Sequence, residues 1–360
     1  MAVIFSVFSF FYLAFASWVY NSKKINKYLF CVFVSLLSGL FSIYFSHDAL
    51  AYKNIFLNYS VSGFSKIFDE MANYELFFLF FMKAFSFLPV EMFFCIVAIL
   101  SFYIKITLIE KVSRDSLLSL ICFFSVFFLY FDGTVVRVSM GIAIAYWGVY
   151  FLSKNKFLNF SIIVFSACLF FHYSLFVLII MPLFRSRFSV KVTLALIFIF
   201  FMMYVMGVGI LDPILWMMSY LDTSIPGLNK FNSYLLHSQS GDPYSLVLIF
   251  LFLACLITYY FFIRELSDFE LISYNMIFLS FLFLIVFYQN QVFQNRFSEI
   301  FRYSLVFISP LFYRFLYCFS NSRVFSLAVY LFFMSGYFFY FYLYKEIIYD
   351  GNLKIISLFI

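Results

Sequence analysis

The sequence predicts an all-α, polytopic integral membrane protein that forms one membrane domain over residues 1–360. Three observations carry this prediction. First, 66% of the residues are apolar and only 11% are charged, whereas soluble domains carry about 25% charged residues. Second, apolar runs long enough to form membrane helices recur along the chain. Third, basic residues gather in alternate short loops, as they do on the cytoplasmic side of membrane proteins.

Polar breaks divide the chain into apolar runs, and spans of about 20 residues leave room for about 11–12 transmembrane helices. The expected spans lie near residues 2–20, 29–46, 90–109, 117–131, 138–152, 157–171, 173–184, 192–211, 245–263, 271–288, 303–319 and 324–344. Two connecting loops are long, near residues 47–74 and 212–244. Loops of this length usually serve as lids or binding loops.

The basic residues predict the orientation of the helices. More than half of the 23 Lys and Arg residues fall in one set of alternate loops, which we expect to be cytoplasmic. They are Lys23, Lys24, Lys27, Lys111, Arg114, Lys154, Lys156, Arg185, Arg187, Lys191, Arg264, Arg314 and Arg323. The long loops and both termini then lie on the outer side.

Residues 75–88 are apolar but do not fit this count as a full span. They are short, contain Lys83 and stop at Pro89. A full span here would invert every later loop and turn the basic loops outward. A re-entrant or interfacial helix fits better, because irregular backbone at membrane depth is tolerated where it lines a cavity.

Residues 157–184 form an apolar stretch between two basic loops, interrupted only by His172. Two helices of about 14 residues each rise about 21 Å, less than the hydrocarbon core of about 30 Å. We therefore expect a hairpin whose tip, His172, lies below the outer surface. An imidazole there suits a general base near neutral pH. The alternative is a histidine that is hydrogen-bonded within the helix bundle.

Three arginines are expected on the outer side, although basic residues tend to stay in cytoplasmic loops. A requirement other than membrane topology therefore explains their position better. Arg137 opens the span that follows Asp132, and its planar guanidinium is suited to clamping a phosphate. Its alternative is an interfacial anchor whose charged head reaches water. Arg296 and Arg302 lie in a short polar outer loop, where each is a candidate ligand residue or a structural partner of Glu299.

Asp48 and Tyr52 begin the first long outer loop, four residues apart. Residues at this spacing share one face of a helix. They are candidates for binding a sugar hydroxyl, with helix capping by Asp48 as the alternative.

Cysteine and metal chemistry are not predicted. All six cysteines lie in apolar runs without a Cys-x-x-Cys spacing, and the three histidines are far apart. No acidic cluster offers ligands for a divalent metal. We therefore expect a metal-independent protein without a cofactor, and no nucleic-acid partner.

Three stretches taken together resemble the EpsG-like, Wzy-type polysaccharide polymerases. The first is Ser46-His-Asp48-Ala-Leu-Ala-Tyr52. The second is Val136-Arg137-Val-Ser-Met-Gly141, followed about 30 residues later by Phe171-His172-Tyr-Ser174. The third is Arg296-Phe-Ser-Glu-Ile-Phe-Arg302-Tyr303, ending at Pro310. Arg137 and Gly148 also fit an arginine, ten residues, glycine pattern of some members.

The resemblance implies a bacterial inner-membrane enzyme that joins glycan repeat units carried on undecaprenyl diphosphate, with its active site facing the periplasm. The product would be O-antigen, capsule or exopolysaccharide. His172 would act as the base for the acceptor hydroxyl, and Arg137 with Arg296 or Arg302 would bind the diphosphate in place of a metal ion. Membrane lipid is a further partner, and a chain-length regulator and the flippase of the pathway are candidate protein partners.

Two other functions stay open at this point. A membrane O-acyltransferase also uses a buried histidine, but it takes its acyl group from the cytoplasm, and all three histidines here are expected outside. A flippase for lipid-linked oligosaccharide also needs cations for diphosphate, but we would expect them along a central cavity. Only Lys83 and Lys105 lie within apolar segments.

Overall fold

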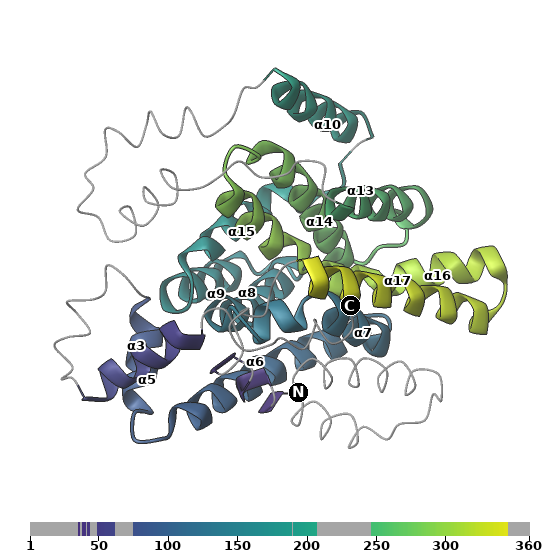
Figure 1. Ribbon diagram of the computed structural model, residues 1–360. Helices are drawn as coiled ribbons and strands as arrows, with labels where there is room; N and C mark the ends of the chain where they lie inside the picture. The colour runs from purple at the N-terminus through teal and green to yellow at the C-terminus, as the bar shows by residue number, and fades with distance from the viewer. Residues whose placement is uncertain are drawn as a thin grey trace.

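The computed structural model describes residues 35–36, 38–40, 42–43, 49–61, 75–188, 190–206 and 246–344. These residues form helices and turns, without a strand, so the all-α prediction is confirmed. The helices, labelled as in Figure 1, are α3 Ala49–Val61, α5 Leu76–Ala84, α6 Val90–Val112, α7 Ser116–Val126, η1 Phe128–Asp132, α8 Val136–Ser153, α9 Phe157–Phe170, η2 Tyr173–Phe184, α10 Val190–Val205, α13 Leu246–Ile257, η3 Thr258–Phe262, α14 Asp268–Val286, α15 Gln291–Arg302, α16 Leu305–Ser320 and α17 Arg323–Tyr344.

Three of the described helices are long and apolar enough to cross a membrane: α6, α8 and α14. Shorter apolar helices or helix pairs occupy the other spans expected after residue 90. The expected span at 2–20, most of that at 29–46, Asp48 and the expected loop at 212–244 lie outside the described residues. The polytopic class predicted from composition is confirmed.

Helix α14 is the centre of the bundle. Its apolar window is 94% buried, which suits a helix that is apolar on all sides. A capping box starts it: the Ser267 side chain accepts from the Glu270 backbone N–H, and Glu270 accepts from that of Ser267. Glu270 also accepts from Arg114, in the loop between α6 and α7, and this bond raises the pKa of the Arg114 guanidinium. The Arg114 contact joins α14 to the neighbouring helices.

Helices α8 and α9 form a tight antiparallel hairpin beside α14 and α6 (Figure 1). A side-chain carbon on Gly148 would lie 3.0 Å from Val164 Cγ2 and 3.3 Å from the Phe160 carbonyl oxygen. A side chain at this position would force its neighbours to shift by a few tenths of an ångström, so glycine favours the close approach of the two helices. The glycine of the predicted spacing pattern therefore has a packing role.

Helix α5 corresponds to the short apolar segment expected at residues 75–88. Its nine residues rise about 14 Å, about half of the hydrocarbon core. It packs on α3 and α9, and the chain then turns at Pro89 into α6. This length agrees with a helix that does not cross the membrane.

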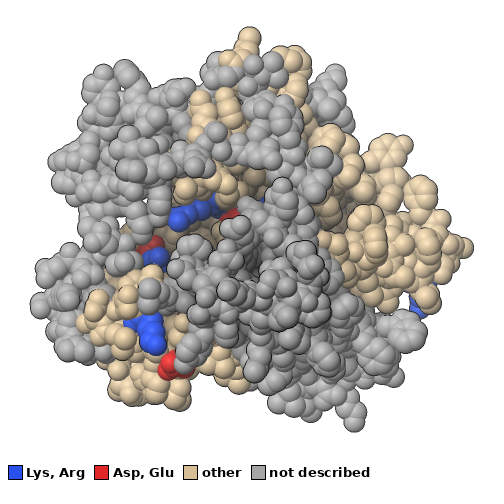
Figure 2. All heavy atoms as spheres, viewed as in Figure 1, with Lys and Arg blue, Asp and Glu red and all other residues tan. Residues whose placement is uncertain are grey.

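The described surface carries many exposed large apolar side chains, among them Phe87, Leu158, Tyr260 and Phe332. Figure 2 shows one face of the molecule, where only a few of the described atoms belong to Lys, Arg, Asp or Glu. A surface of this kind is expected where lipid rather than water is the solvent.

Candidate functional site

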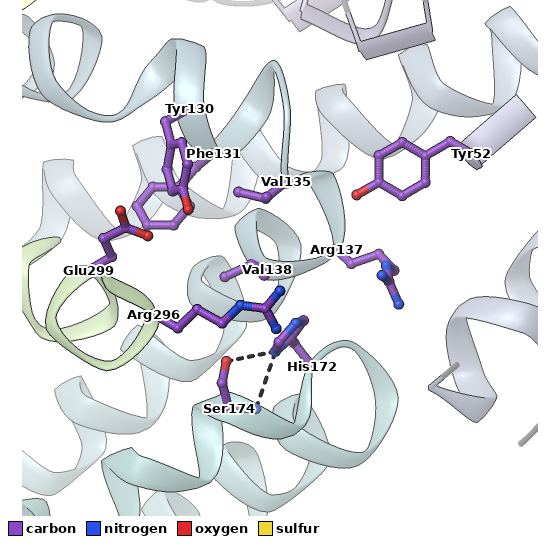
Figure 3. Close-up of a pocket in the computed structure, with 10 residues that line it drawn as sticks. All are labelled: Tyr52, Tyr130, Phe131, Val135, Arg137, Val138, His172, Ser174, Arg296 and Glu299. Atoms are coloured by element: carbon purple, nitrogen blue, oxygen red, sulfur yellow. Dashed lines mark hydrogen bonds between the residues drawn. The ribbon is translucent and has the colours of Figure 1, made fainter. Parts of the chain in front are cut away.

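Helix ends from distant parts of the chain surround a cavity of about 90 Å³ (Figure 3). It is lined by Tyr52, Tyr130, Phe131, Val135, Arg137, Val138, His172, Ser174, Arg296 and Glu299. The α8–α9 hairpin shows which end of the bundle this is. Arg137 lies at the start of α8 and His172 just after the end of α9, whereas the basic turn at Lys154–Lys156 lies at the opposite end.

A π-helical turn, η1, forms one wall. Its wider ring is closed by a bond from the Gly133 N–H to the Phe128 carbonyl, 3.2 Å, and the Val135 N–H donates to the Tyr130 carbonyl at 3.0 Å. Such turns shift the side-chain register of a helix and are frequent at functional sites. Here Tyr130 and Phe131 face the cavity, while Asp132 is buried on the other side.

Asp132 anchors this turn through a buried ion pair. Lys105 Nζ of α6 lies 2.7 Å from both carboxylate oxygens, and both side chains are almost fully buried. Ser101 and Ser139 also donate to the carboxylate. The network joins α6, η1 and α8 immediately behind the cavity wall, and it accounts for a lysine in an apolar segment.

Arg137 is oriented by a carboxylate that the sequence analysis did not identify. Its guanidinium donates to the Glu75 carboxylate, at the start of α5, and lies 6.0 Å from the Tyr52 ring and 5.8 Å from the Phe78 ring. The Glu75 side chain is only 2% exposed. Cation–π contacts and a buried carboxylate hold one side of the planar group, and Arg137 also lines the cavity.

His172 lies at the predicted hairpin tip, between α9 and the 3₁₀ helix η2. It is 9% exposed. Its Nδ1 accepts from the Ser174 backbone N–H at 3.2 Å and lies 2.6 Å from Ser174 Oγ (Figure 3). The histidine is therefore both the cap of η2 and part of the cavity wall.

Helix α15 supplies the wall across the cavity from Arg137 (Figure 3). Asn290 caps it by accepting from the Val292 and Phe293 N–H groups, and the buried Tyr146 hydroxyl donates to the Ile300 carbonyl at 2.7 Å. Arg296 and Glu299 both face the cavity from this helix (Figure 3).

Arg302 is placed differently from Arg296. It is buried behind Glu299, with Nη2 3.4 Å from Oε1, and its Nε has no hydrogen-bond partner among the described residues. The structural pairing with Glu299, which the sequence left open, is thus present.

The structure brings together four of the six residues predicted for the site: Tyr52, Arg137, His172 and Arg296. Arg302 is one layer behind, and Asp48 is outside the described residues. Sequence reasoning missed the contributions of Tyr130 and Ser174 and considered Glu299 only as a partner of arginine. The signal that could have identified Glu299 is its position one helical turn from Arg296, which places the two side chains on the same face of a helix.

Chemically, the cavity combines two guanidinium groups with one imidazole, one carboxylate, one aliphatic hydroxyl and two phenols. Arginines are suited to binding phosphate, and a carboxylate or imidazole is suited to moving a proton. No three described His, Cys, Asp or Glu side chains are grouped so that they could hold a metal ion. Metal-independent chemistry stays a prediction.

Comparison with known proteins places the whole membrane domain in context. The model of the EpsG family matches residues 24–356, nearly the entire chain. No curated protein matches, and no solved structure matches.

Proposed function

This chain belongs to the EpsG family, whose members are Wzy-like polymerases, and we propose that it joins glycan repeat units carried on undecaprenyl diphosphate. The observation that carries the proposal is the convergence of Arg137 and Arg296 on one cavity with His172. These residues come from three separate segments of the chain. Charged groups are costly to place inside a membrane protein, so their common position supports a functional role.

In the proposed reaction, an acceptor sugar hydroxyl attacks the anomeric carbon of the donor, and the lipid diphosphate leaves. The leaving group gains negative charge as the bond breaks, so preorganised cations lower the barrier. Arg137 and Arg296 supply this charge, and Tyr52 binds glycan or diphosphate beside Arg137. A single displacement inverts the anomeric configuration, through an oxocarbenium-like transition state.

We place the cavity at the periplasmic side of the bacterial inner membrane. The support is that it lies at the end of the α8–α9 hairpin opposite Lys154 and Lys156, and basic loops stay cytoplasmic. In a variant without native cysteines, Lys154→Cys should react with a membrane-impermeant maleimide only after the inner membrane is opened. Reaction in intact spheroplasts would invert the proposed orientation.

Of the two lysines that could bind diphosphate in a flippase, Lys83 and Lys105, the second is already paired within the protein. Lys105 is bound by Asp132 and is 2% exposed, so its charge is already matched within the protein. The acyltransferase alternative is separated from polymerisation by the product formed.

The test is the size distribution of surface glycan from a deletion strain that carries wild type, Arg137→Ala or His172→Ala. Arg323→Ala is the matched control, an exposed arginine in the first turn of α17. We expect a ladder for wild type and control, and only single-unit glycan for the two cavity variants at equal protein level. A ladder in the deletion strain with altered acetyl content would favour the acyltransferase, and loss of the single-unit band would favour an earlier step such as flipping.

A further inference from the structure

Glu299 is the one carboxylate among the described residues that line the cavity. It is 4% exposed, on α15, one helical turn from Arg296. Figure 3 shows its carboxylate beside the Tyr130 hydroxyl, across the cavity from Arg137. The cavity therefore has a cationic region at Arg137 and Arg296 and an acidic corner at Glu299.

The hydrogen bonds of His172 limit what its ring can do in this arrangement. A backbone N–H can only donate, so the Nδ1 that accepts from Ser174 carries no proton. The neutral ring then carries its proton on Nε2 and presents that nitrogen as a donor. The basic nitrogen is therefore occupied by Ser174, whose Oγ also lies 2.6 Å from it.

Protonation of Nδ1 would also put two donors against each other, at the 3.2 Å contact with the Ser174 N–H. The contact by which His172 caps η2 therefore disfavours proton uptake by Nδ1, which a histidine base would require. Glu299 has no such conflict, since an ionised carboxylate accepts only and has four lone-pair sites. Arg302 Nη2 lies 3.4 Å from Oε1 and holds the carboxylate in position.

We propose that Glu299, rather than His172, is the general base that deprotonates the acceptor hydroxyl, while His172 donates from Nε2. The inference rests on the proposed function and assigns the proton in it. As the acceptor oxygen forms its bond to the anomeric carbon, its O–H proton passes to Glu299. The bond between that carbon and the diphosphate oxygen breaks, and its electron pair leaves with the diphosphate, next to Arg137 and Arg296. Glu299 then releases the proton to water.

Azide distinguishes a base from a residue that stabilises the leaving group, because azide is already an anion and attacks without losing a proton. Purified protein is given a lipid-diphosphate-linked repeat unit with and without sodium azide. We expect Glu299→Ala to lose glycan transfer by about 10²-fold or more and to form the glycosyl azide of inverted configuration. Arg137→Ala and His172→Ala should lose both reactions.

Two further variants keep the result interpretable. Glu299→Gln preserves the side-chain volume and should lose glycan transfer to a similar extent, while Asp268→Asn, an exposed acid at the start of α14, should transfer normally. Normal transfer by Glu299→Gln would overturn the proposal, as would azide product from His172→Ala but not from Glu299→Ala. If the wild type transfers sugar to neither acceptor, the proposed function itself is wrong.

Discussion

The buried ion pair between Lys105 and Asp132 allows a quantitative test of how the cavity wall is held. Each side chain is at most 2% exposed, and the carboxylate also accepts from Ser101 and Ser139. Removal of one partner leaves a charge in a low-dielectric interior, which typically costs about 3–5 kcal/mol. This is a factor of about 10²–10⁴ in the ratio of folded to unfolded protein.

The two single variants should differ, because their remaining partners differ. Lys105→Met leaves Asp132 with two serine donors, so we expect a loss near the lower end of that range. Asp132→Asn leaves the Lys105 ammonium buried without a counter-charge, beside a neutral amide and the Ser139 hydroxyl, so we expect the larger loss. The double variant has no charge at either of these two positions, and we expect it to recover to within about 1 kcal/mol of wild type, because neutral replacements of buried pairs are often tolerated.

Thermal unfolding of the four proteins in one detergent measures these differences as a double-mutant cycle. Lys111→Met is the control on the same helix, an exposed lysine over the rings of Trp147 and Tyr150, with an expected loss below about 1 kcal/mol. Unchanged stability of Lys105→Met, or a double variant that is the sum of the two singles, would refute the reasoning.

Three other predictions follow from individual contacts. Arg137→Lys keeps the positive charge but loses the planar guanidinium that can form two parallel hydrogen bonds. One charge-assisted hydrogen bond contributes about 1.5–3 kcal/mol, so the polymerisation rate of purified protein should fall by at least about 10-fold. Equal rates would exclude bidentate binding. Gly148→Leu should destabilise the protein by about 1–3 kcal/mol or more, measured by thermal unfolding, because its side chain would meet Val164; wild-type stability would contradict the close approach of α8 and α9. Tyr146→Phe leaves the Ile300 carbonyl without its donor, and we expect a loss of about 1–2 kcal/mol by the same measurement; no loss would show that the bond is not formed.

The helices of the described chain were largely predictable, because each depends on local hydropathy. The expected spans from residue 90 onward correspond to helices, and the hairpin tip at His172 is where helix-length arithmetic put it. Helices α3 and α15 lie in segments that the sequence pattern predicts to be loops. Helix α15 has polar residues along much of its length, so hydropathy does not reveal it, and packing against α14 and its Asn290 cap hold it in place.

The sequence by itself determined that this protein is a helical membrane protein of a polymerase family, and it identified Arg137, Tyr52, His172 and Arg296 as candidates. These properties are carried by composition, run length and short motifs. Only the tertiary structure decided which groups meet. Arg137 pairs with Glu75, 62 residues away, and Lys105 with Asp132, 27 residues away. Glu299 lines the cavity while Arg302 is buried behind it. Such contacts depend on how helices pack, since the free energy of a buried charge is set by its neighbours in space and not by its neighbours along the chain.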